Sequence, residues 1–186
     1  LSFMTMEYAE KGTLNSLIST QVRLHPSLSL RLCSEIAEAL AHAHSLDPPL
    51  VHLDIKPRNV LIVESEGEIH VKVSDFGLAQ TLDSESRLCK SAGTLAFAPP
   101  EMAWGVADER TDVYGIGVTL YRTLTGIHPF PIFSPESVTA SREYHQALSA
   151  GRRSIKPPSQ MLLQNHHALD PVIMKALAFD MFSRHR

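Results

Sequence analysis

Two stretches of the chain carry apolar residues in helical patterns. Between Ser29 and Ser45 the apolar positions are 32, 33, 36, 37, 40 and 41, a spacing typical of an amphipathic helix with one face on a core. From Val113 to Leu124 the chain carries a single charge and is apolar on nearly every side, and Thr111 and Asp112 stand where capping groups belong. We expect this second helix in the middle of a domain.

Shorter helices are indicated by start and stop residues. Thr13 is a candidate N-cap for a helix over positions 14–18, and Pro26 is expected to break the stretch that follows. Further helices are expected over 140–150 and 170–179, the latter with its Asp-Pro pair at N-cap and N1.

The β-structure predicted for the chain is minor. Leu1–Met6 is short and apolar, as in a buried strand. A strand-like piece near Val51 precedes strands over Val60–Val63 and Ile69–Val73, with Gly67 in the turn between them. No repeat and no domain boundary is visible, so we expect one α+β domain, mainly helical, with a small sheet packed on helices.

Composition narrows the possible partners. The 186 residues are 44% hydrophobic and 20% charged, values close to the globular average, and the formal charge is -3. This balance predicts no binding to nucleic acid or anionic membranes. The longest uncharged run, Thr123–Pro135, is too short and too rich in proline to span a bilayer. Cys33 and Cys89 are expected to be free thiols, and a disulfide between them stays open.

Three short motifs stand in order along the chain. They are His52-Leu53-Asp54-Ile55-Lys56-Pro57-Arg58-Asn59, then Asp75-Phe76-Gly77, then Gly93-Thr94 followed by Pro99-Pro100-Glu101. On these motifs the chain resembles the eukaryotic protein-kinase family over essentially its whole length. The resemblance implies a protein kinase domain over 1–186, from the hinge strand to the start of the last helix of the C-terminal lobe. Because no Gly-rich loop precedes the hinge, we expect a large-lobe fragment without its small lobe, inactive alone.

The resemblance assigns chemistry to five residues. Transfer of a phosphoryl group needs a positioned hydroxyl, metal ions on the phosphates and positive charge at the moving group. Asp54 would accept the proton of the substrate hydroxyl, and Lys56 would reach the γ-phosphate of ATP. Asn59 and Asp75 would offer oxygen ligands to Mg2+. Thr94 would hydrogen-bond Asp54 and Lys56 beside the acceptor.

Further residues take binding or structural roles by the same resemblance. Met6 would be the gatekeeper, and the Glu7 carbonyl and Ala9 amide would face the adenine. The structural residues are His52 behind the metal-binding segment, Asp112 as an anchor of the catalytic loop, and the ion pair Glu101–Arg184.

Two positions depart from the family pattern. Leu53 replaces the usual Arg before the catalytic Asp, as in a non-RD kinase, so a loop phosphate would lack its partner there. Pro99 replaces the usual Ala.

From the resemblance as a whole we expect a Ser/Thr protein kinase that uses ATP and Mg2+ on protein substrates in intracellular signalling. It would be cytoplasmic, with attachment to a membrane receptor and the oligomeric state left open. A pseudokinase scaffold and a small-molecule phosphotransferase are the alternatives.

Overall fold

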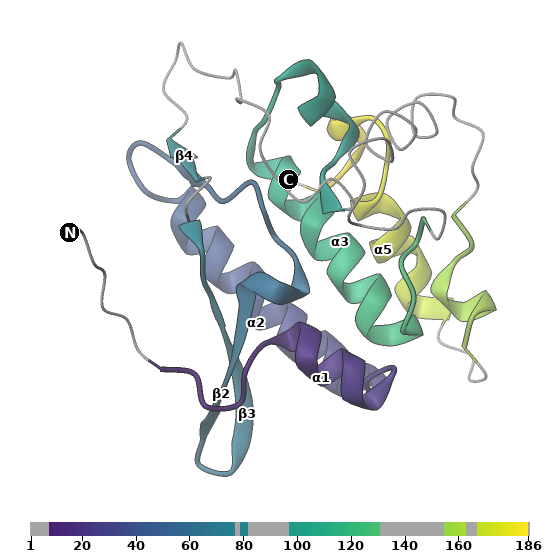
Figure 1. Ribbon diagram of the computed structural model, residues 1–186. Helices are drawn as coiled ribbons and strands as arrows, with labels where there is room; N and C mark the ends of the chain where they lie inside the picture. Colours follow the sequence, from purple (N-terminus) through teal and green to yellow (C-terminus); the bar gives the residue numbers. More distant parts are fainter. Residues whose placement is uncertain (1–7, 77–78, 82–96, 131–154, 163–166, 186) are drawn as a thin grey trace.

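The structure is a computed structural model that describes residues 8–76, 79–81, 97–130, 155–162 and 167–185. Helices dominate this part of the chain, and short strands form two separate pairs (Figure 1). The helices are α1 (Leu14–Gln21), α2 (Pro26–His44), α3 (Glu109–Thr125) and α5 (Asp170–Ala176), and the strands are β1 (Leu50–Val51), β2 (Val60–Ser65), β3 (Glu68–Val73) and β4 (Gln80–Thr81). The expected mainly helical α+β architecture is confirmed.

The first two helices begin at defined residues. Thr13 is the N-cap of α1, as predicted, in a capping box: its hydroxyl accepts from the Ser16 amide, and its own amide donates to the Ser16 hydroxyl at 3.0 Å. Pro26 does not break a segment but opens α2, because proline lacks only an N–H that has no partner in the first turn. The predicted start at Ser29 was therefore three residues late.

The central helix α3 also begins earlier than its apolar pattern. Asp108 is the N-cap and forms a capping box with Thr111, which releases Asp112 from the capping role expected for it. At α5 the N-cap is Leu169, not Asp170, and the helix ends at Ala176 instead of 179. The Asp170 carboxylate instead accepts hydrogen bonds from Ser159 of a preceding turn.

The hairpin of β2 and β3 packs on α2. Its antiparallel register pairs Val60 with Val73 and Ser65 with Glu68, around the turn that contains Gly67 at φ 81°. Glu35 of α2 accepts a hydrogen bond from the Val71 amide at 2.8 Å and so ties the hairpin to the helix. A second pair joins β1 to β4, and the sequence analysis did not predict β4.

Helices α2 and α3 meet in one core, with α5 on another side of α3 (Figure 1). Its fully enclosed side chains among the described residues are Leu14, Leu32, Ile36, Val60, Tyr114, Val118 and Ile173. At Gly115 the helix lies so close to Ile55 that a Cβ would be 2.8 Å from the Ile55 Cβ and 2.9 Å from its carbonyl oxygen. The loop around Ile55 thus rests directly on α3.

Some expectations fall beyond the residues described. These are the strand over Leu1–Met6, the helix over 140–150 and the state of Cys89. Cys33 lies in the core, where burial raises the pKa of its thiol to about 12. In the described ranges, no helix is long and apolar enough to cross a bilayer.

Candidate active site

The β2–β3 hairpin brings two oxygen-bearing side chains to its open end. Asn59 immediately precedes β2, and Asp75 follows β3 after Ser74. Since Val60 pairs with Val73, Asn59 and Ser74 are opposite one another, and the Ser74 amide donates to the Asn59 carbonyl at 2.8 Å. The register therefore places the two predicted metal ligands in adjacent segments although 16 positions separate them.

Asp54 lies in the loop between β1 and the short 3-10 helix Pro57–Asn59, and only 8% of it is exposed. Its Oδ2 is 2.5 Å from Lys56 Nζ and 3.0 Å from Asn59 Nδ2. The same Asn59 nitrogen donates to the Asp54 main-chain carbonyl at 2.9 Å. Three of the predicted site residues thus meet around one carboxylate oxygen.

The amide of Asn59 has a fixed direction. Because its Nδ2 is committed to Asp54, its Oδ1 points elsewhere, and none of the described residues donates a hydrogen bond to it. Asp75 is exposed and has a left-handed backbone, with φ 64°. One carbonyl oxygen and one carboxylate are the hard ligands that Mg2+ prefers.

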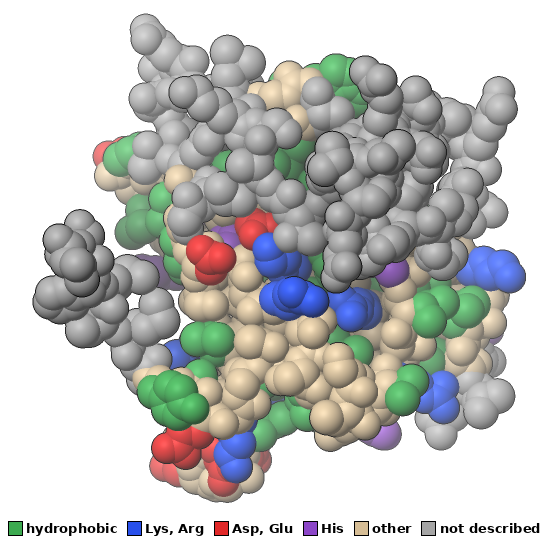
Figure 2. Space-filling model, viewed as in Figure 1, with side chains coloured by type: hydrophobic (Ala, Val, Ile, Leu, Met, Phe, Trp, Pro, Cys, Tyr) green, Lys and Arg blue, Asp and Glu red, His purple; other side chains and the backbone are tan. Residues whose placement is uncertain are grey.

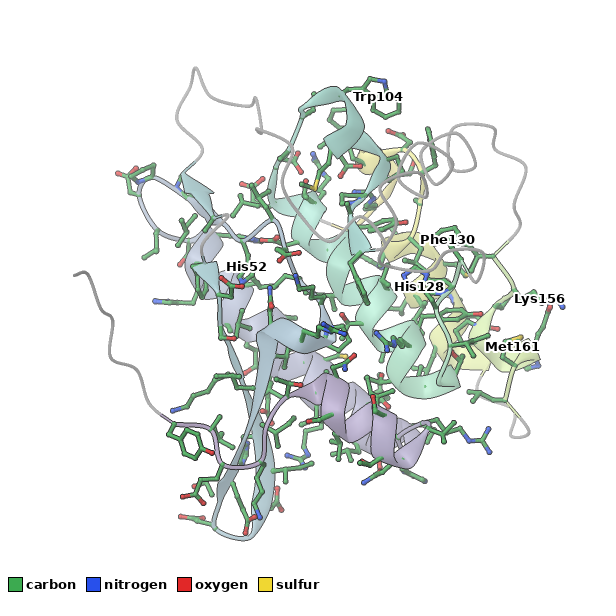
Figure 3. All side chains as sticks on the ribbon, in the orientation of Figure 1. His52, Trp104, His128, Phe130, Lys156 and Met161 are labelled. Carbon is green, nitrogen blue, oxygen red and sulfur yellow. The ribbon has the colours of Figure 1, made fainter. Side chains whose placement is uncertain are left out.

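His52 connects the segment that contains Asp54 with the segment that contains Ser74. Its ring is fully buried, and its Nδ1 accepts a hydrogen bond from the Asp54 amide, so Nε2 carries the proton and donates to the Ser74 carbonyl at 3.0 Å. The ring also contacts Phe76, with 4.6 Å between the ring centroids. Figure 3 shows the labelled His52 between the hairpin and the loop. The structural role predicted for this residue matches these contacts.

Asp112 of α3 holds the loop from the core side. Its Oδ1 accepts from the Leu53 amide at 2.8 Å, and its Oδ2 accepts from the His52 amide at 2.9 Å and from His44 Nε2 at 2.8 Å. Only 1% of Asp112 is exposed. A buried carboxylate with three donors is well satisfied and fixes the backbone immediately before Asp54.

Leu53 occupies the position of the expected Arg and points into an apolar cluster. Its side chain is buried with Val51, Ala98, Met102 and Ala107. The segment around Ala98 is thereby packed against the catalytic-loop candidate by hydrophobic contact. At this position the site has no cation for a phosphate to pair with.

Glu101 and Arg184 form the buried ion pair that the sequence predicted. Arg184 Nη2 is 2.7 Å from Glu101 Oε2, and the second guanidinium nitrogen contacts Oε1. The other Arg184 donors reach the carbonyls of Ala178, Phe179 and Arg110, and the guanidinium also lies over the Tyr114 ring. This bidentate pair ties the segment after Pro99 to the C-terminal end.

The structure leaves part of the predicted set untested and adds two residues. Met6, Glu7 and Thr94 lie outside the described ranges. Ala9 closes a turn through its carbonyl, which accepts from Gly12. The sequence analysis missed His44 and the Ser74 carbonyl as supports. His44 carried no motif signal, whereas Ser74 adjoins the Asp75 motif.

Comparison with known proteins agrees with this geometry. The protein kinase domain profile matches residues 2–185. The chain is 34% identical to the serine/threonine-protein kinase PrkC of Bacillus subtilis over 186 residues, covering 98% of the chain and 27% of that protein. It is 33% identical to the serine/threonine-protein kinase PknB of Mycobacterium leprae over 190 residues, covering 100% of the chain and 28% of that protein.

The chain spans about a quarter of the length of these curated relatives. The matched domain nevertheless covers nearly all of the chain. The chain belongs to the protein kinase family.

Proposed function

We propose that the protein containing this chain is a serine/threonine protein kinase that transfers the γ-phosphoryl group of ATP, with Mg2+, to Ser or Thr hydroxyls of proteins. The observation that carries this proposal is the Asp54 carboxylate, buried and held by Lys56 and Asn59, with Asp75 directly after Ser74, whose amide donates to the Asn59 carbonyl. Residues 1–186 would be part of its kinase domain.

Each residue has a role that its contacts support. Asp54 accepts the proton of the acceptor hydroxyl, and its anchored loop keeps the carboxylate aimed. Lys56, whose positive charge lies beside Asp54, compensates the negative charge of the phosphoryl group during transfer. Asn59 Oδ1 and the exposed Asp75 carboxylate would hold Mg2+, whose charge neutralises the phosphates when it is bound.

The remaining assignments extend the same proposal. Thr94 would help orient Asp54 and Lys56. Met6, Glu7 and the amide of Ala9 would bind the adenine end of ATP. Protein substrates belong to the proposed activity, and we propose a cytoplasmic location with attachment to a membrane receptor left open.

A pseudokinase is the second candidate, because Leu53 removes a cation that most family members carry. The contacts of Asp54 favour catalysis. Burying a carboxylate is costly, and a site without catalytic function would not require one that is held by the donors of Lys56 and Asn59. An assay of ATP-dependent phosphorylation with the full-length protein decides between the two, and complete absence of transfer would favour the scaffold.

We expect Asp75→Asn to weaken binding of Mg-ATP at least about tenfold and to lower turnover as well. The variant keeps the size of the side chain but removes the charge that a divalent ion prefers. Titration of a fluorescent ATP analogue at fixed Mg2+ measures the affinity of the full-length protein. The exposed Asp47→Asn variant is the matched control. Unchanged affinity in Asp75→Asn would contradict the metal assignment.

A second expectation concerns activation. Ser84, Ser86 and Ser91 lie in the segment where kinases are commonly phosphorylated, outside the described residues. Since Leu53 is packed on Ala98 and offers no cation, we expect the triple Ser→Ala variant to keep activity within about tenfold of wild type. Both full-length enzymes are assayed as purified, and wild type is assayed again after phosphatase treatment. A larger loss would show that one serine is a switch.

A further inference from the structure

Two arginines from distant parts of the chain lie on adjoining segments beside the candidate site, because Arg122 follows Gly115 by two turns on the same face of α3, and Gly115 lies against Ile55, three residues before Arg58. Arg58 is exposed in the 3-10 helix between Lys56 and Asn59, and Arg122 is half-buried in the last turn of α3. Burial, and then the positive charge of Arg58, lower the pKa of Arg122. Figure 2 shows Lys and Arg side chains gathered next to acidic ones on this face.

These two cations have no carboxylate of their own in the described part of the chain. By contrast, Arg31, Arg110 and Arg184 each form an ion pair. Two neighbouring guanidinium groups repel one another when no negative charge is near. An anion bound between them offsets this repulsion and is therefore favoured. The pair is therefore a ready site for an anionic group supplied by a ligand.

The position of the pair identifies the kind of ligand. Lys56 and Asn59, which are within two positions of Arg58 along the chain, both contact the Asp54 carboxylate. Arg122 lies over the ring of Phe97, with 5.9 Å from its guanidinium carbon to the ring centre. Phe97 follows the Gly93-Thr94 motif in sequence. The pair is thus bounded by the loop that carries Asp54 and by the segment assigned to the acceptor side.

We propose that Arg58 and Arg122 bind an acidic side chain of the protein substrate, within a few residues of the phosphorylated Ser or Thr, and so make the kinase selective for acidic sequences. This inference rests on the proposed function and names its substrate class. The shared chemistry is an anionic side chain, supplied by Asp, Glu or a residue that is already phosphorylated. Guanidinium groups suit both, because they pair bidentately with carboxylates and phosphates.

The test uses peptides with one Ser acceptor in an Ala background. Asp, phosphoserine or Lys is placed in turn at each of the four positions on either side, and kcat/KM of the phosphatase-treated full-length enzyme is measured. We expect Asp at one or two positions to raise kcat/KM about tenfold over Ala, phosphoserine to raise it further, and Lys to lower it. The preference should shrink with added salt.

Charge reversal supplies the decisive comparison. Arg58→Glu with Arg122→Glu should abolish the preference for Asp and favour Lys at the same positions, while Ala peptides are affected little. Lys175→Glu, at an exposed position of α5, is the control with the same change of charge. If the double variant does not fold, Arg58→Glu alone at its exposed position should still remove most of the preference. An active enzyme with no preference for acidic peptides would overturn the inference. So would an acidic preference that stays intact in both variants.

Failure of the proposed function gives a different result. If no phosphoryl transfer occurs with any peptide, binding of fluorescent peptides with Ala in place of Ser is measured by anisotropy. Tighter binding of the Asp peptides, lost in Arg58→Glu, would support the anion site without catalysis. Equal binding of Asp and Ala peptides would overturn it.

Discussion

Replacing Asp54 with Asn is expected to lower kcat at least about a thousandfold while the affinity for Mg-ATP stays within about twofold of wild type. General base catalysis and the orientation of the acceptor hydroxyl are both lost, because an amide does not accept the proton. The substitution keeps the shape of the side chain, so Asn59 can retain an acceptor there. Lys56 loses the negative charge that it contacts, which adds to the loss in turnover.

The two quantities are measured separately on the full-length protein. Steady-state phosphorylation of a protein substrate gives kcat, and titration of a fluorescent ATP analogue gives the affinity. The thermal midpoint of unfolding shows whether the variant is folded. Turnover close to that of wild type would remove Asp54 from the mechanism, whereas a parallel loss of nucleotide affinity would assign it to ATP binding.

Glu101→Ala is expected to lower the free energy of unfolding by about 3–5 kcal/mol. The substitution leaves the Arg184 guanidinium buried, 4% exposed, without the carboxylate that faces two of its nitrogens. Carbonyl oxygens of three other residues remain as acceptors, but none of them carries a full charge. The uncompensated charge is the main source of the loss.

A double-mutant cycle and a control test this cause. In urea unfolding of the full-length protein, Arg184→Met combined with Glu101→Leu should lose less stability than either partner's removal alone, because no lone charge remains buried. Lys11→Met, which breaks the exposed pair Lys11–Glu64, should change the midpoint little. Similar small losses for Glu101→Ala and Lys11→Met would contradict the argument.

The sequence predicted helices well where an apolar stripe marked them and poorly at their polar ends. The pattern of α3 becomes apolar only at Val113, yet the helix begins at Glu109, because Asp108 and Thr111 satisfy its first amides. Pro26 was misinterpreted for a related reason, since the same residue can end one segment or open the next. The strand β4 has two residues, too few to show any alternation.

In the candidate site, too, local contacts could be predicted from the sequence and contacts between distant segments could not. Asp54, Lys56 and Asn59 are close in sequence, so a local motif was enough to predict their meeting. Contacts between distant segments left no local pattern, as for His44 with Asp112 and for the packing of Leu53. The direction of Arg58 likewise could not be derived from sequence. Its neighbour Arg122 belongs to a helix 64 positions away, brought there by the packing of α3 under the loop.

The attachment of the loop to Asp112 has a consequence for how this site opens. The amide protons of His52 and Leu53 are bound to a carboxylate on α3 that water does not reach. They can exchange with solvent deuterium only when the loop separates from the helix. Exchange at these two amides therefore reports the free energy of docking the loop on its helix, without substrate, nucleotide or any measurement of turnover.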